Sequence, residues 1–112
     1  MDQLHDLAEE TVLADAMAAE VAVLYKHSPR CPTSRYAMHE VRSFADSRPD
    51  VPVYVVNVVK NRELSQQLAD DLCVAHRSPQ VILLRRGSAE ANASHHSITE
   101  DLLERWVGEA AQ

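Results

Sequence analysis

The sequence predicts an α/β fold in which helices flank a four-stranded mixed sheet, with a further helix at the N-terminus. Short runs rich in β-branched and aliphatic residues recur at positions 21–25, 53–59 and 81–84, as is typical of strands inside a sheet. Segments with apolar residues at helical spacing separate these runs. No repeat, linker or low-complexity tract interrupts the 112 residues, so we expect one domain over residues 1–112.

The beginning of the chain predicts helix followed by strand. Two groups of apolar residues at helical spacing indicate one or two short amphipathic helices. The groups are Leu4, Leu7 and Ala8, then Leu13, Ala14, Met17 and Ala18. Residues 21–25 follow as the first strand, and Pro29 and Pro32 then impose a turn.

The middle of the chain predicts two helices around a central strand. The first helix begins near Cys31 or Pro32 and ends before Arg48, because apolar residues between them share one helical face. These residues are Ala37, Met38, Val41, Phe44 and Ala45. The run at 53–59 is nearly all β-branched, which indicates a strand covered on both faces. Asn61 is expected to cap a second helix whose leucines recur every four residues, at 64, 68 and 72.

The remaining residues predict two antiparallel strands and a last helix. Residues 81–84 and 89–93 are joined by a tight turn containing Gly87, which favours antiparallel pairing. Ser97 and Glu100 have the spacing of a capping box and would open a helix with Trp106 on its apolar side. A βαβ unit followed by a ββα unit is the thioredoxin topology, and fold alone does not name a chemistry.

Composition excludes several classes of protein. Eleven basic and seventeen acidic residues give a net charge of −6, which argues against a partner that is nucleic acid. No apolar run reaches the roughly 20 residues that a membrane span needs, and acidic residues stand where a signal peptide would be basic. We therefore expect a cytoplasmic protein whose two cysteines are free thiols at rest.

Cys31 is the strongest candidate for a catalytic residue, because it stands where a buried strand ends and a helix begins. The unpaired N–H groups and positive dipole end of a helix N-terminus stabilise a thiolate. Four neighbouring cationic or ionisable side chains could lower the pKa of the thiol further if they turn towards the sulfur. They are Lys26, His27, Arg30 and Arg35. The alternative is an inert buried cysteine at an ordinary helix start.

The residues after Cys31 predict a monothiol site. Pro32 suits the first turn of a helix, where its missing N–H costs nothing. Thr33 follows, and Ser34 stands where a dithiol enzyme carries its second cysteine. A serine hydroxyl can bond the thiolate and cannot resolve a mixed disulfide, so an outside thiol would have to release Cys31.

The dipeptide Ser78-Pro79 lies directly before the third predicted strand, where proteins of this topology place a cis-proline facing the cysteine. A cis bond there would leave the backbone beside the sulfur free to pair with an extended substrate. An ordinary trans proline at the start of a strand is the alternative.

Three other residues have less certain roles. Cys73 ends the second predicted helix, and we interpret it as a small buried residue, with a resolving cysteine for Cys31 as the alternative. His95 and His96 are interpreted as exposed loop residues, and contact with a thiol co-substrate is the alternative. No ligand spacing recurs, so we expect no metal site.

Several segments in a fixed order resemble the monothiol bacilliredoxin family. They are Tyr-Lys-His-Ser at 25–28, Cys-Pro-Thr-Ser at 31–34, Arg-Glu-Leu-Ser at 62–65, Ser-Pro-Gln at 78–80 and Ala-Ser-His at 93–95 with Ile-Thr at 98–99. These are small thioredoxin-like proteins once grouped with general-stress proteins. The resemblance covers residues 20 to 108 and implies removal of bacillithiol from S-bacillithiolated cytosolic proteins.

Carried onto this chain, the resemblance makes Cys31 the nucleophile, Ser34 the mark of the monothiol variant and Pro79 the cis-proline of the substrate groove. It implies bacillithiol as a co-substrate, with no bound cofactor. A low-molecular-weight thiol or a dedicated reductase would regenerate Cys31.

Two other functions stay open at this point. The segment from His27 to Cys31, with Ser34 and Arg35, also resembles the opening of thioredoxin-fold arsenate reductases. The further arginines that hold the oxyanion in those enzymes have no clear counterparts here. The second alternative is a non-catalytic thioredoxin-like module that binds partners through the groove at Pro79.

Overall fold

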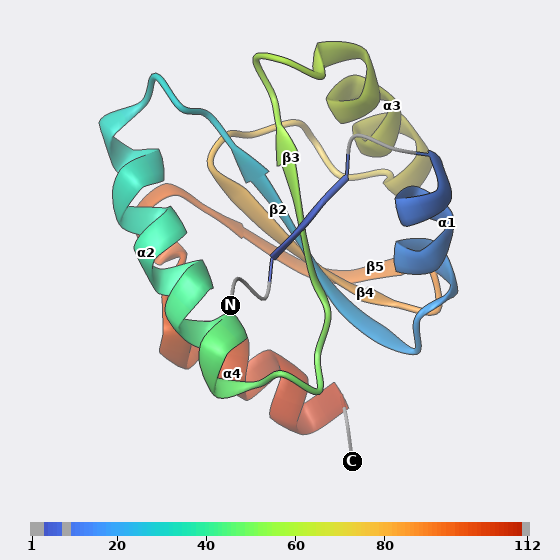
Figure 1. The fold of residues 1–112 in the computed structure, drawn as a ribbon, viewed down its shortest axis with the longest axis vertical. Coiled ribbons are helices and arrows are strands. Elements are labelled where there is room, and N and C mark those ends of the chain that lie inside the picture. The colour runs from blue at the N-terminus through green and yellow to red at the C-terminus, as the bar shows by residue number, and fades with distance from the viewer. Residues whose placement is uncertain (1–3, 8–9, 111–112) are drawn as a thin grey trace.

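The computed structural model describes residues 4–7 and 10–110, which form one five-stranded sheet with helices on both faces (Figure 1). The strand order is β1-β3-β2-β4-β5. β1, β3 and β2 run parallel, whereas β4 is antiparallel to β2 and β5 is antiparallel to β4. The strands are β1 (Leu4–Asp6), β2 (Val21–His27), β3 (Val53–Asn57), β4 (Gln80–Arg85) and β5 (Ser88–Ser94).

The helices divide into two pairs, one on each face of the sheet (Figure 1). They are α1 (Glu10–Ala18), α2 (Pro32–Ser47), α3 (Arg62–Leu72) and α4 (Glu100–Ala110), with a short 3-10 turn, η1 (His95–Ser97), before α4. α2 and α4 cover one face, and α1 and α3 cover the other. Within the described residues, none of these helices has the length and apolar character needed to cross a membrane.

The central strand β2 contributes side chains to the hydrophobic cores on both faces of the sheet. Val23 and Tyr25 are buried with Phe44 on the α2 side, whereas Ala22 and Leu24 are buried on the α3 side. Successive side chains of a strand point to opposite faces of the sheet, so a strand covered on both faces must be apolar at nearly every position. This requirement explains the continuous apolar run that predicted β2.

The N-terminal segment differs from the prediction, because Leu4 belongs to a fifth strand and not to a helix. β1 pairs with β3 from Leu4 opposite Val53 to Asp6 opposite Val55, and the Leu7 N–H donates to the Val55 carbonyl at 2.8 Å. A strand of three residues is too short to show alternation in the sequence. The predicted helix is therefore shorter and begins at Glu10, and Ala8 lies outside the described residues.

Two asparagines stand at the end of β3 and at the start of α3, and only the first uses its side chain to end an element. The predicted strand over 53–59 ends at Asn57, whose Oδ1 accepts the N–H groups of Val59 and Lys60, both at 3.0 Å, and so turns the chain towards α3. Asn61 occupies the N-cap position of α3 as predicted, but its side chain makes no capping hydrogen bond.

The start of α4 also differs from the capping box expected at Ser97. Thr99 Oγ1 accepts the N–H of Leu102 at 3.1 Å and is therefore the capping group, while Ser97 lies in η1. The carboxylate of Glu100 turns away from the helix end and accepts hydrogen bonds from Ser43 and Ser47 of α2, at 2.8 and 3.1 Å. These contacts join α4 to α2. Glu100 therefore bonds to a neighbouring helix and does not complete the predicted capping box.

Replacing Thr99 by alanine is expected to lower the free energy of unfolding by about 1 kcal/mol, because the N–H of Leu102 loses its acceptor. Ser97→Ala is the matched control and should change stability by less than about 0.5 kcal/mol, because Ser97 is exposed. Urea denaturation of both variants measures the difference. Equal losses would show that Thr99 does not cap α4.

Candidate active site

Cys31 lies at the junction between β2 and α2. β2 ends at His27, a short loop follows, and Cys31 is the N-cap residue of α2 with φ −100° and ψ 124°. The N–H of Cys31 donates to the Ser28 carbonyl at 3.1 Å, which closes the loop, and Pro32 begins the helix. Cys31 is half-buried and its thiol is free. The predicted placement at a helix N-terminus is confirmed.

The first turn of α2 lowers the pKa of the Cys31 thiol below its usual range. The backbone N–H groups of Ser34 and Thr33 are the largest causes, and the two side-chain hydroxyls add to them. Partial burial of the sulfur opposes the shift. A helix N-terminus acts in this way because its N–H groups have no acceptor within the helix and can stabilise a nearby negative charge. The site therefore favours the thiolate, which is the nucleophilic form.

Ser34 is fully buried and connects the loop to the helix. Its Oγ accepts the N–H of Ser28 at 3.2 Å, so the hydroxyl proton remains available to the sulfur of Cys31. A cysteine at this position would have supplied a second thiol within the turn. The serine instead supplies a hydroxyl that contributes to the lowered pKa of Cys31.

Tyr25 is a site residue that is not among the predicted catalytic or tuning residues. Its buried hydroxyl donates to the Ser34 carbonyl at 3.1 Å and lies 3.0 Å from Nδ1 of His27. Because the one hydroxyl proton is used on Ser34, His27 must donate from Nδ1, which leaves Nε2 without a proton. Burial raises the pKa of Tyr25 and lowers the pKa of His27, so both rings stay neutral. The available signal in the sequence was a tyrosine near the end of the strand that leads to Cys31.

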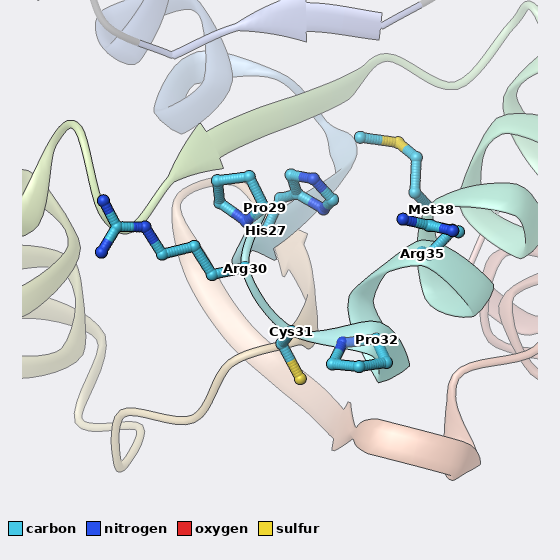
Figure 2. A pocket seen from close by; sticks show the side chains of 7 residues that line it. All are labelled: His27, Pro29, Arg30, Cys31, Pro32, Arg35 and Met38. Carbon is cyan, nitrogen blue, oxygen red and sulfur yellow. The ribbon is translucent and has the colours of Figure 1, made fainter.

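A pocket of about 440 Å³ opens beside Cys31 and brings together three of the four predicted tuning residues (Figure 2). Its lining consists of His27, Pro29, Arg30, Cys31, Pro32, Arg35 and Met38. Figure 2 shows the side chains of Arg30 and Cys31 leaving the loop in opposite directions. The causes of the lowered Cys31 pKa are hydrogen bonds from Thr33 and Ser34, with partial burial opposing them. The influence of the two arginines on the thiolate stays a prediction.

Lys26 is placed differently from the prediction, on the opposite face of β2 from Tyr25. Its side chain is fully buried against α3, where Nζ donates to the Ser65 carbonyl at 3.0 Å and lies 3.2 Å from Nδ1 of His76. Strand alternation sends neighbouring side chains to opposite faces, so Lys26 cannot point where Tyr25 points. The expectation that Lys26 tunes the Cys31 thiolate is therefore corrected.

The Ser78-Pro79 peptide bond is cis, as predicted. Lys26 pairs with Gln80 across β2 and β4, so Pro79 lies level with His27 at the end of the sheet that carries the Cys31 loop. Pro79 is buried, and its carbonyl accepts the N–H of His95 at 3.1 Å. The cis-proline and the cysteine loop thus lie at the same end of the sheet.

Cys73 is exposed, which corrects its interpretation as a buried packing residue. It ends α3 in the left-handed conformation, with φ 56° and ψ 39°, and its N–H points back to the carbonyls of Ala69 and Asp70. Ending a helix in this way requires a left-handed residue, whatever the polarity of its side chain. The role of Cys73 as a resolving cysteine stays a prediction, and its thiol is free in the structure.

The two loop histidines lie on the surface, as interpreted from the sequence. His95 and His96 are exposed, and the His96 ring lies 6.3 Å from the ring of Tyr36. In the part of the chain that the structure describes, no three His, Cys, Asp or Glu residues gather in a way that could hold a metal ion.

Comparison with known proteins connects this geometry to a family. The family model described as monothiol bacilliredoxin BrxC matches residues 2–103. The chain belongs to the monothiol bacilliredoxin family. This membership confirms the resemblance seen in the sequence and makes the protein a relative of thiol oxidoreductases.

Solved structures confirm that this bacilliredoxin has the predicted thioredoxin-like fold, with one strand more than expected. A protein of thioredoxin fold proposed to be an oxidoreductase is 25% identical and gives a TM-score of 0.84, with 97% of this chain and 94% of that chain covered. Thioredoxin from Trypanosoma brucei brucei is 15% identical with a TM-score of 0.78, covering 96% and 90%. Thioredoxin f2 from Chlamydomonas reinhardtii is 22% identical with a TM-score of 0.74, covering 95% and 94%.

Alkylation of Cys31 by iodoacetamide should remain fast at pH values where an ordinary cysteine is already protonated, because its lowered pKa preserves the thiolate as pH falls. Thr33→Ala and Ser34→Ala should each move the midpoint of the rate–pH profile upwards. Arg105→Gln is the control and should leave it unchanged, because it removes an exposed guanidinium from α4, outside the pocket beside Cys31. All are measured in a Cys73→Ala background. A midpoint that stays unchanged in both hydroxyl variants would contradict the contribution of the Thr33 and Ser34 side chains.

Replacing Cys73 by glycine should raise the free energy of unfolding by about 1 kcal/mol, because glycine adopts the left-handed conformation without the steric cost of a Cβ atom. Cys73→Ala is the matched control, since it removes the same thiol and keeps the Cβ. Denaturation under reducing conditions compares the two. Equal stability of the variants would show that backbone conformation at the end of α3 is not limiting.

Proposed function

We propose that this protein removes bacillithiol from S-bacillithiolated proteins in the cytoplasm, through a mixed disulfide on Cys31. The observation that carries the proposal is a thiol of lowered pKa at the N-cap of α2, in a chain of the monothiol bacilliredoxin family. A thiolate at a half-exposed helix N-terminus is both nucleophilic and accessible to a disulfide. No resident cofactor takes part, and bacillithiol is a co-substrate.

The first step is attack by the Cys31 thiolate on the bacillithiol sulfur of the protein mixed disulfide. A new bond joins Cys31 to bacillithiol, the old disulfide bond breaks, and the target protein leaves as a thiolate that takes a proton from water. The target cysteine is reduced and Cys31 is oxidised in the same exchange. The first turn of α2 assists because it stabilises the attacking thiolate.

The second step needs a thiol from outside the Cys31 turn. Ser34 cannot attack the mixed disulfide, so an external thiolate attacks the bacillithiol sulfur and releases Cys31 as a thiolate. A low-molecular-weight thiol or a dedicated reductase supplies that thiolate and carries bacillithiol away as a new disulfide. Ser78 and Pro79 lie level with the end of β2. An extended segment of the target protein would pair with the backbone there.

Mass spectrometry after mixing with a bacillithiolated model protein tests the proposal. We expect the wild-type protein to acquire one bacillithiol adduct on Cys31 while the model protein loses its own. Cys31→Ser should abolish transfer by at least about 100-fold, since it removes the nucleophile. Cys73→Ala is the matched control and should still form the adduct. An unmodified Cys31 with unchanged substrate would contradict the proposed function.

The same variants separate the two alternatives. Arsenate reduction that depends on Cys31, without bacillithiol transfer, would favour the arsenate reductase-like activity. Partner proteins that bind wild type and Cys31→Ser equally, with no thiol exchange by wild type, would favour a non-catalytic binding module. Family membership favours thiol exchange over both.

A further inference from the structure

A second pocket of about 410 Å³ lies on the other side of the Cys31 loop from the first. It is lined by Ser28, Val58, Val59, Arg62, Ser65, Gln66, His76 and Ser78. Ser28 precedes Cys31 by three positions, so at most about 10 Å of extended chain separates them. Ser78 belongs to the cis-proline turn. We call this cavity the Arg62 pocket. Its position allows one molecule to reach both the pocket and the Cys31 sulfur.

A buried cation lies beneath the Arg62 pocket. Lys26 has no exposed surface. Its Nζ donates a hydrogen bond to the Ser65 carbonyl and lies within hydrogen-bond distance of Nδ1 of His76. Both partners belong to residues that line the pocket, and neither is a carboxylate. Burying an ammonium is costly unless an anion compensates it. Desolvation lowers the pKa of Lys26 accordingly, so a negative group entering this pocket would stabilise the charged amine.

Other groups on the pocket wall favour an anion as well. Arg62 is exposed on the lining and is the first residue of α3, whose positive dipole end faces the same space. Asn61 leaves that helix end without a side-chain cap. His76 also lines the pocket, and its Nδ1 lies 3.2 Å from the ammonium nitrogen of Lys26. The pocket thus has an exposed guanidinium on its wall and a buried ammonium behind Ser65 and His76.

We propose that the Arg62 pocket binds a carboxylate of the low-molecular-weight thiol that forms the mixed disulfide with Cys31. This inference rests on the proposed function and specifies how the co-substrate is recognised. Bacillithiol fits this chemistry, because its malate group carries carboxylates at the end of the molecule away from its sulfur. Arg62 would bind the carboxylate directly, and Lys26 would add charge from beneath.

Rates of Cys31 oxidation by two disulfides test the proposal, in a Cys73→Ala background. Bacillithiol disulfide carries carboxylates, whereas hydroxyethyl disulfide carries none. Arg62→Gln should slow the reaction with bacillithiol disulfide about five- to tenfold and leave the reaction with hydroxyethyl disulfide within about twofold. Arg105→Gln is the matched control, because it removes an exposed guanidinium from α4 on the other face of the sheet. It should change neither rate beyond about twofold.

The outcomes separate this inference from the proposed function. A wild-type protein that does not prefer bacillithiol disulfide would contradict the proposed function itself. A preference that survives Arg62→Gln unchanged, or a loss that is equal for both disulfides, would overturn only the carboxylate site. Lys26→Met provides a second variant and should reduce the same preference, with thermal unfolding used to verify that it folds. If that variant does not fold, the exposed Arg62 still decides the question.

Discussion

The junction between β2 and α2 depends on Ser34. Its hydroxyl accepts the N–H of Ser28, and its carbonyl accepts the buried hydroxyl of Tyr25. These two bonds fix the start of α2 relative to the strand, so the N–H groups of its first turn lie around the sulfur of Cys31. The thiolate is stabilised mainly by backbone dipoles that are already in place, which costs no reorganisation when charge develops. The residue that replaces a second thiol is thus also the one that organises the site.

Alternation along β2 distributes two functions between the faces of the sheet. Tyr25 points towards α2 and supports the cysteine turn, while Lys26 points towards α3 and lies beneath the Arg62 pocket. Both proposed sites adjoin the loop that leaves this strand. A mixed disulfide on Cys31 would therefore have its sulfur at one side of the loop and its charged end at the other. This division follows from a period of two residues in a strand buried on both faces.

Much of the fold could be predicted because its main elements carry strong periodic patterns. The runs that form β2, β3 and β4 and the apolar face of α2 all lie where their patterns indicated. β1 was missed because three residues show no period, and its strand conformation exists only through pairing with β3. The predicted burial of Cys73 was wrong. Cysteine side chains are usually buried, but the residue that ends α3 adopts the left-handed conformation at the surface.

The sequence by itself predicted the fold class, the position of Cys31 at a helix N-terminus, the monothiol pattern with Ser34 and a cis bond before Pro79. Each of these could be predicted from residue types and from the order of the predicted strands and helices along the chain. The tertiary structure alone decided which ionisable groups surround the sulfur and which lie elsewhere. Lys26, five positions before Cys31, was expected to tune the thiolate and instead contacts Ser65 and His76. Proximity in sequence does not specify the face of a strand on which a charge is buried, because that depends on the elements packed against it.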